Sequence, residues 1–146
     1  FWIRDPNQLI IYPDLVSSNP RQDFLWQQTC FEIFIGVKGE DFYREINLSP
    51  SQAWQAYQFE EYRYPEDMPP QAADDIELNQ LKRTHYGLNV SVDLTDFIAT
   101  HKLKWENLFL GLSAVLKTSQ GDQYYAMQHS SPQADFHNKR DWLHVF

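Results

Sequence analysis

Apolar side chains recur at every second position along two neighbouring stretches of the chain, residues 29–37 and 42–49. Because successive side chains of a β-strand point to opposite faces of a sheet, this period predicts two strands, each with one apolar face. The four residues between them, Lys38 to Asp41, suit a hairpin loop, so we expect Val37 to pair with Phe42. Local pattern and loop length thus predict the register of an antiparallel hairpin.

This register gives the predicted hairpin two unlike faces. One face is almost wholly apolar and is typical of a strand pair that packs on a second sheet; it carries the pairs Phe31/Leu48, Ile33/Ile46, Ile35/Arg44 and Val37/Phe42. The other face mixes hydrogen-bonding groups with aromatic rings; it carries the pairs Cys30/Ser49, Glu32/Asn47, Phe34/Glu45 and Gly36/Tyr43. A surface of the second kind suits a polar ligand, so we place the candidate binding site there.

The rest of the chain predicts further strands and almost no helix. Residues 64–75 hold three prolines and an acidic end, which predicts an exposed loop, and residues 96–101 predict one helical turn capped by Asp93 or Thr95. Short strands without βαβ alternation indicate an all-β fold, an antiparallel β-sandwich. Besides the hairpin, we expect strands at residues 9–12, 54–62, 86–94, 107–117, 123–128 and 142–146.

Length and charge narrow the class of protein. A chain of 146 residues is long enough to bury a core and predicts a single β-sandwich domain over residues 1–146. The formal net charge of -8, with 12 Lys and Arg that form no dense cluster, argues against a nucleic-acid partner. No apolar run approaches the length of a membrane span. A neutral or cationic ligand fits this composition better.

Cys30 is the only cysteine, which excludes an intrachain disulfide. Its place on a predicted strand favours a buried thiol over a nucleophile. A single cysteine without a disulfide partner weakly favours a cytoplasmic location, although the sequence does not decide whether the protein is exported. The chain opens on Phe1 rather than Met, in sequence that is irregular or strand-like, so we leave open a leader or a further N-terminal strand of the sandwich before it.

Three stretches of the chain form a recognisable set of motifs: Leu25-Trp26-x-x-Thr-Cys-Phe-Glu-Ile-Phe34, Tyr43-x-Glu-Ile-Asn-Leu-Ser-Pro50 and Trp54-x-x-Tyr-x-Phe59. They resemble the DOMON-like group of domains, which is related to family 9 carbohydrate-binding modules. The resemblance extends more loosely to the hairpin around Gly121-Asp122 and to Pro132-x-x-Asp-Phe-His137, and it covers most of the chain from about Arg21 onward. It implies a jelly-roll-like β-sandwich of the sugar-binding or haem-binding kind, and the fold carries over better than the ligand.

Carbohydrate binding without catalysis is the function that these residues favour. Glu32 and Asn47 lie opposite each other and can bond sugar hydroxyls, although the same two residues can also form a purely structural buried pair. Trp26, at the rim of the sheet, can stack on the apolar face of a sugar, and Trp54 can act likewise unless it packs in the core. Weaker candidates for ligand contact are Tyr57, Tyr43 and Arg21.

A glycoside-processing enzyme is the alternative from another class. Glu32 and Glu45 fall diagonally across the polar face, and two neighbouring carboxylates are the apparatus of glycoside hydrolysis. Diagonal carboxylates also arise on sheet faces by chance, and the sequence has no second acid motif. The chain also lacks a Gly-x-Ser-x-Gly elbow, which argues against a nucleophile triad.

Haem and metal sites are further alternatives. DOMON cytochromes use Met and His as axial ligands, but Met127 and His129 are two residues apart on one predicted strand and would point to the same side, which leaves Met68. We therefore expect no haem. No zinc spacing occurs, and a loop site of Asp135, His137 and Asp141 competes with a simple capped turn. Calcium stays open, because family 9 modules use it structurally and the acids cluster at Asp74, Asp75 and Glu77.

Overall fold

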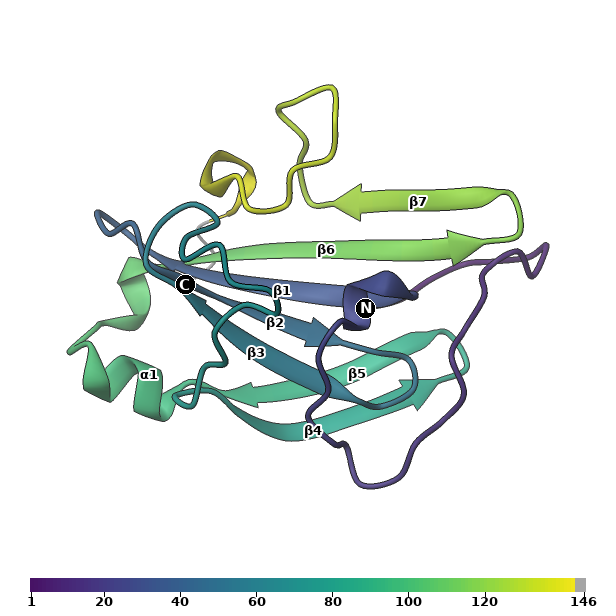
Figure 1. Cartoon of the computed structure of the whole chain (residues 1–146), viewed down its shortest axis with the longest axis horizontal. Helices are drawn as coiled ribbons and strands as arrows, with labels where there is room; N and C mark the ends of the chain where they lie inside the picture. The colour runs from purple at the N-terminus through teal and green to yellow at the C-terminus, as the bar shows by residue number, and fades with distance from the viewer. Residues whose placement is uncertain (144–146) are drawn as a thin grey trace.

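The computed structural model describes residues 1–143 and is mostly β-structure (Figure 1). A five-stranded antiparallel sheet has the order β3-β2-β1-β6-β7, and β4 and β5 form a second antiparallel sheet. One short helix, α1, spans Thr95–Thr100. The strands are β1 (Cys30–Val37), β2 (Tyr43–Leu48), β3 (Trp54–Phe59), β4 (Glu77–Thr84), β5 (Gly87–Asp93), β6 (Leu108–Thr118) and β7 (Gly121–Ala126). Within the described residues no helix has both the length and the apolar character needed to cross a membrane.

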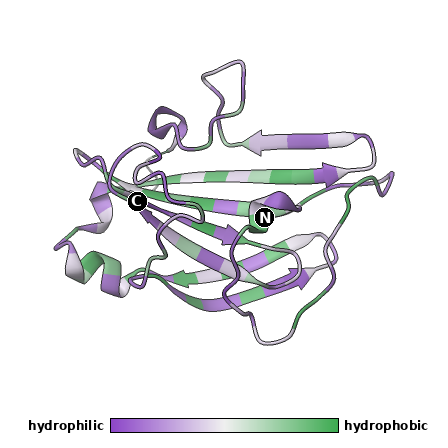
Figure 2. Ribbon diagram, viewed as in Figure 1, coloured by the Kyte–Doolittle hydropathy of each residue, from purple (hydrophilic) through white to green (hydrophobic). Residues whose placement is uncertain are grey.

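The predicted register of the β1–β2 hairpin is confirmed. Glu32 lies opposite Asn47, and Ile33 lies opposite Ile46. Figure 2 shows hydrophobic and hydrophilic residues interspersed along β1 and β2, without a strict alternation of colour. The two faces of the hairpin are therefore assigned as the sequence predicts, because a shift by one residue would exchange every side chain between them.

The apolar face of the five-stranded sheet forms one core with the two-stranded sheet and the helix. From the second sheet, Leu81 of β4 and Leu88 of β5 are buried in this core, and Phe97 of α1 joins them. Arg44 is buried on the same face because Asp75 accepts two hydrogen bonds from its guanidinium, at 2.8 and 2.6 Å. The buried residues that the five-stranded sheet contributes are Phe31, Ile33, Ile35, Val37, Ile46, Leu48, Trp54, Ala56, Leu108, Ala114 and Leu116.

Several predicted elements differ from the observed ones. β4 was not predicted, because six of its eight residues are polar and Leu81 alone is fully buried, so no apolar period marks it. The strand predicted at 9–12 is reduced to one isolated bridge between Ile10 and Thr118. The predicted closing strand, 142–146, contributes one bridge from Leu143 to Leu110, and residues 144–146 lie outside the described part. The helical turn is confirmed, but its N-cap residue is Leu94, which has no side chain able to cap, in place of the predicted Asp93 or Thr95. The Asp93 carboxylate, one residue earlier, accepts from the Thr95 amide at 2.8 Å.

The central strand β1 is buried on both faces along all of its residues. The face away from the core is covered by the segment that follows β7, whose Trp142 ring lies on the backbone of two glycines. A Cβ added at Gly111 would come within 2.5 Å of this ring, and one added at Gly36 within 2.8 Å. Phe34 stacks on the same ring with centroids 5.3 Å apart. The glycines thus form a slot that lets the C-terminal segment approach the sheet.

Filling this slot should destabilise the fold. We expect Gly111→Ala to lower the free energy of unfolding by about 1–3 kcal/mol, the usual cost of an overpacked contact, measured by urea unfolding. In a Trp142→Leu background the same substitution should cost less than about 0.5 kcal/mol, because the smaller side chain leaves room for the methyl group. An equal loss in both backgrounds would show that the slot does not depend on the Trp142 ring.

Candidate functional site

The polar face of the β1–β2 hairpin forms the floor of a hollow of about 710 Å³. Glu32 of β1 and Glu45 of β2 lie at this floor, while Trp26 belongs to a 3-10 helix, Leu25–Gln27, that precedes β1. The loop after β3 and the segment after β7 supply further walls. The segment after β7 is yellow in Figure 1. Residues of these walls include Arg63, Pro65, Met68, Phe136 and His137, and Phe59 at the end of β3 also lines the hollow.

The two carboxylates at the floor are almost completely buried. Glu32 is 4% exposed and Glu45 is 6% exposed. The Ser113 hydroxyl donates to Glu32 Oε2 at 2.7 Å, and Asn47 Nδ2 donates to Glu45 Oε1 at 3.0 Å. In the described part of the chain, no lysine or arginine forms an ion pair with either carboxylate. The side chains that donate hydrogen bonds to the two carboxylates are thus neutral.

This environment raises the pKa of both carboxyl groups. For Glu32 the cause is burial, which the Ser113 hydrogen bond and the distant positive charge of Arg63 offset in part. For Glu45 burial comes first, and the nearby charge of Glu32 raises its pKa further. Two such groups that repel each other keep a proton between them well above the pH at which an ordinary glutamic acid ionises.

A chain of hydrogen bonds positions His137 beside Glu45. The Arg63 amide donates to the Tyr43 hydroxyl at 3.1 Å, and this hydroxyl lies 2.6 Å from His137 Nδ1. Burial lowers the pKa of His137 to about 3, so the ring is neutral, and burial raises the pKa of Tyr43, which therefore keeps its proton. Donation from Tyr43 to Nδ1 leaves the ring hydrogen on Nε2, which faces Glu45 Oε2 at 3.5 Å.

Asp135 ties two walls of the hollow together. It accepts a hydrogen bond from the Tyr62 hydroxyl at 2.9 Å and from the Arg63 guanidinium at 3.1 Å. Both donors lie in the loop after β3, whereas Asp135 belongs to the segment after β7. That segment is held to the sheet in turn, because Trp142 Nε1 donates to the Phe136 carbonyl at 2.9 Å. The walls are thus held on a scaffold of polar contacts.

Trp26, Glu32 and two further predicted residues meet around this hollow. Trp26 is half-buried in its wall, and its ring centroid lies 5.7 Å from that of Tyr57. The Tyr57 hydroxyl donates to Asp23 at 2.9 Å, so Tyr57 supports Trp26 from behind. Tyr43 acts similarly through His137. These tyrosines are buried, so their position is one of support behind the exposed surface.

Three other predicted residues do not line the hollow. Asn47 is completely buried; it donates to Glu45 and accepts from the Cys30 thiol at 3.6 Å, so the structure uses it to orient a carboxylate. Trp54 is 8% exposed and packs in the core on the opposite face of the sheet. The Arg21 guanidinium lies 4.8 Å from the Trp54 ring centroid, also away from the hollow. The buried thiol predicted for Cys30 is confirmed.

Sequence reasoning missed most of the wall residues. Arg63 lies in a proline-rich loop whose sequence carries no signal for a site. His137 and Phe136 belong to the Pro132-x-x-Asp-Phe-His137 stretch of the resemblance, which was the available signal, but the sequence favoured a capped turn there. That turn does exist at Asp141, whose carboxylate accepts from Ser130. Ser113 had no signal, because its side chain meets Glu32 through pairing of β1 with β6.

The structure shows where the residues considered for metal and haem binding lie. Asp74 forms an ion pair with Arg21 and Asp75 one with Arg44, and residues 1–143 contain no group of three or more acidic, His or Cys side chains that could hold a metal ion. Met68 lines the hollow together with His137, whose two ring nitrogens face Tyr43 and Glu45. β7 ends at Ala126, so Met127 and His129 follow that strand, contrary to the prediction that they lie on it.

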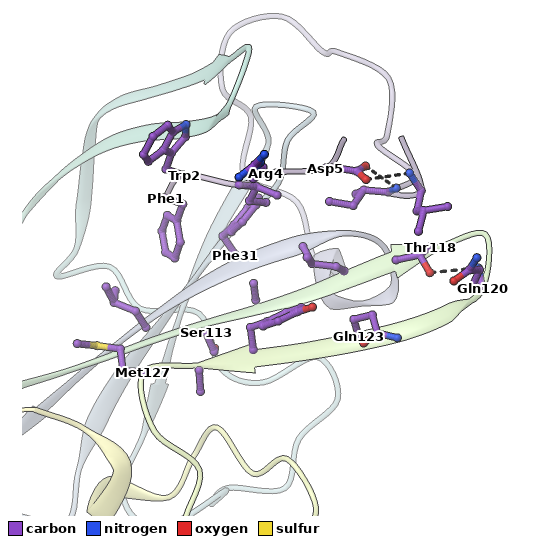
Figure 3. A pocket seen from close by; sticks show the side chains of 18 residues that line it. Phe1, Trp2, Arg4, Asp5, Phe31, Ser113, Thr118, Gln120, Gln123 and Met127 are labelled. Carbon is purple, nitrogen blue, oxygen red and sulfur yellow. Dashed lines mark hydrogen bonds between the residues drawn. The ribbon is translucent and has the colours of Figure 1, made fainter. Parts of the chain in front are cut away.

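A second hollow of about 700 Å³ lies between residues 1–10 and β6–β7 (Figure 3). Two of its polar side chains are satisfied within the protein, and one of them is the Asp5 carboxylate, which accepts from the amides of Leu9 and Ile10 at 3.0 and 2.9 Å. The Thr118 hydroxyl likewise accepts from the Gln120 amide at 3.1 Å. The hollow on the polar face is the better candidate for a binding site, because a site needs polar groups that converge on a ligand.

Comparisons with protein-family models, with curated proteins and with solved structures found no match for this chain. The resemblance to DOMON-like domains therefore rests on the sequence motifs alone and stays a prediction.

The buried carboxylates should make stability depend on pH in a defined direction. Between the ordinary value near 4.5 and the raised pKa, the folded state holds a proton that the unfolded state has lost, so the free energy of unfolding falls as the pH rises. We expect Glu32→Gln to raise the free energy of unfolding by about 1–3 kcal/mol at about pH 8, and this gain to vanish towards pH 4.5. Urea unfolding across this range measures it.

An exposed glutamate provides the matched control for this measurement. Glu77→Gln on β4 should change the free energy of unfolding by less than about 0.5 kcal/mol at every pH. His137 titrates in both the parent and the Glu32→Gln protein, so the difference between them reports on the Glu32 carboxyl group and its effect on Glu45. A loss of stability that is the same at all pH values would contradict the assignment of Glu32 as a desolvated acid.

Proposed function

We propose that this protein is a non-catalytic carbohydrate-binding module whose site is the hollow on the polar face of the β1–β2 hairpin. The observation that carries the proposal is the combination of aromatic walls with a floor of hydrogen-bonding groups. Trp26, Phe136 and Tyr124 contribute rings to the walls, and Glu32 and Glu45 contribute acceptors to the floor. A sugar presents the matching pair of surfaces, because its ring has apolar C–H faces and a rim of hydroxyl groups.

The dimensions and the support of the hollow favour this use. Its volume of about 710 Å³ lies within the range of small-ligand sites. Its floor lies on β1 and β2 of the five-stranded sheet. Asn47 and Ser113 orient the two carboxylates by donating a hydrogen bond to each of them. A site built on strands holds hydrogen-bonding groups more precisely than one built on loops. Reading the orientation of sugar hydroxyls requires such precision.

The proposal also includes a specific type of β-fold. The five-stranded and two-stranded sheets share one core. A β-sandwich is built in the same way, from two sheets that pack face to face around a common core. We assign the chain to a jelly-roll-like sandwich of the DOMON and family 9 type on this arrangement together with the sequence motifs. A saccharide is then the expected ligand.

Removing the aromatic wall should weaken sugar binding. We expect Trp26→Ala to lower the affinity for saccharides by about tenfold, because the ring supplies both buried area and stacking geometry. A glycan array would identify saccharides that bind, and calorimetry would measure their affinity for each variant. The control is Trp2→Ala, since Trp2 is 83% exposed and does not line this hollow. Unchanged affinity in Trp26→Ala, or no saccharide bound by the parent protein, would contradict the proposed site.

A glycoside-processing enzyme is the second candidate, and one observation favours it. Glu32 and Glu45 lie in one hollow with raised pKa values, and the negative charge of Glu32 acts on Glu45. A pair of carboxyl groups that shares a proton can supply one acid and one base, as glycoside hydrolysis requires. Aromatic walls would serve such an enzyme equally well, so turnover is the property that separates the two candidates.

We expect saccharide binding without turnover. Oligosaccharides that bind the protein should remain intact on prolonged incubation, as checked by chromatography of the products, and nitrophenyl glycosides should release no chromophore. Release that is lost in both Glu32→Gln and Glu45→Gln would instead assign the protein to the enzyme class. Loss in a preparation of Glu77→Gln, which lies outside the hollow, would indicate a contaminating activity.

A further inference from the structure

We propose that the hollow is selective for sugars that carry a free amino group, whose ammonium is bound between Glu32 and Glu45. The inference rests on the proposed function and adds the chemical class of the ligand. It follows from how the two carboxylates are surrounded, from where the positive side chains of the hollow point, and from the charge of the walls.

The two carboxylates are nine-tenths or more buried and have unused capacity to accept hydrogen bonds. An ionised carboxylate has about four acceptor positions. Among residues 1–143, Glu32 accepts one hydrogen bond, from Ser113 to Oε2, and its Oε1 accepts none. Glu45 accepts one at Oε1 from Asn47, and its Oε2 faces His137 at 3.5 Å. Both residues line the hollow, so the unused positions are open to a ligand.

The groups around the two carboxylates are neutral. Ser113 and Asn47 are uncharged, and His137 is a neutral imidazole because burial lowers its pKa to about 3. Buried carboxylates ordinarily have a cation as partner, because hydrogen bonds from neutral donors replace only part of their hydration. A bound ammonium would supply this charge together with three N–H donors, and such charge-assisted hydrogen bonds are about twice as strong as neutral ones.

The two positive side chains that line the hollow are held by other acids. Arg63 donates to Asp135 at 3.1 Å, and Lys117 forms an ion pair with Asp122 at 2.5 Å. Neither is within ion-pair distance of Glu32 or Glu45. We therefore assign the role of counter-ion to Glu32 and Glu45 to the ligand.

The walls favour a cation as well. Glu66 and Asp67 line the hollow, so it contains four carboxyl groups, two of which share a proton, and two positive side chains in all. The negative potential of such a concave site raises the local concentration of cations. Trp26 and Phe136 add aromatic faces, which attract cations and also stack on sugar rings. An amino sugar satisfies both kinds of wall with one molecule, whereas a simple amine lacks the stacking surface.

The experiment compares three β-1,4-linked tetrasaccharides that differ at one position of each sugar ring. They are the tetramers of glucosamine, of N-acetylglucosamine and of glucose, with an amine, an acetamide and a hydroxyl at that position. Calorimetry at neutral pH should show that the glucosamine tetramer binds at least about tenfold more tightly than the other two. Glu32→Gln should reduce this preference to less than about threefold, because it removes the partner of the ammonium and so weakens binding of the glucosamine tetramer more than binding of the glucose tetramer.

Two further variants separate the site from the overall negative charge of the protein. Glu45→Gln should act like Glu32→Gln, and Glu32→Gln decides the question where Glu45→Gln fails to fold, as judged by near-ultraviolet circular dichroism. Glu77→Gln removes the same charge from β4, outside the hollow, and should leave the preference unchanged. A preference that persists undiminished in Glu32→Gln would assign it to general attraction and overturn the inference.

The failure of this inference is distinguishable from the failure of the proposed function. Equal binding of the three tetrasaccharides would overturn the preference for amino sugars and leave carbohydrate binding standing. If none of the three binds and a wider glycan array is also negative, both the inference and the proposed function are overturned.

Discussion

Burial of β1 on both faces is the constraint on which the rest of this structure depends. The strand pairs with β2 on one side and β6 on the other, and all of its residues are buried. One face packs on the two-stranded sheet, while the other is covered by the segment after β7. Glu32 therefore points away from the core yet still loses its water. The candidate site exists because a polar strand face is enclosed.

This enclosure depends on close contact between backbone and ring. Gly36 and Gly111 leave a slot for Trp142, which holds the Phe136 carbonyl and with it one wall of the hollow. The same packing removes solvent from the carboxylates, which is a cost to the stability of the fold. Sites that bind ligands commonly keep such unfavourable features, because groups satisfied within the protein would have nothing left to offer a ligand.

Charge in the hollow is distributed so that the floor stays free of protein cations. Asp135 directs the Arg63 guanidinium to the rim, and Tyr43 fixes His137 as a neutral ring beside Glu45. Such a floor can bind hydroxyl groups, bind an ammonium or transfer a proton. These uses share one geometry and differ in which ligand atom meets the carboxylates. The ligand therefore decides between a binding module and an enzyme.

Local periodicity determined the β1–β2 register and its two faces, because alternation and loop length act over a few residues. It did not reveal β4, whose side chains are mostly polar. Nor could it bring Arg63 to Tyr43 or His137 to Glu45, since these contacts join segments far apart in the chain. The sequence also did not decide the position of Trp54, because an aromatic residue suits either the rim or the core of a sheet. In the folded chain Trp54 packs in the core. Hydrophobic alternation decides which way a side chain points, and only long-range packing decides what it meets there.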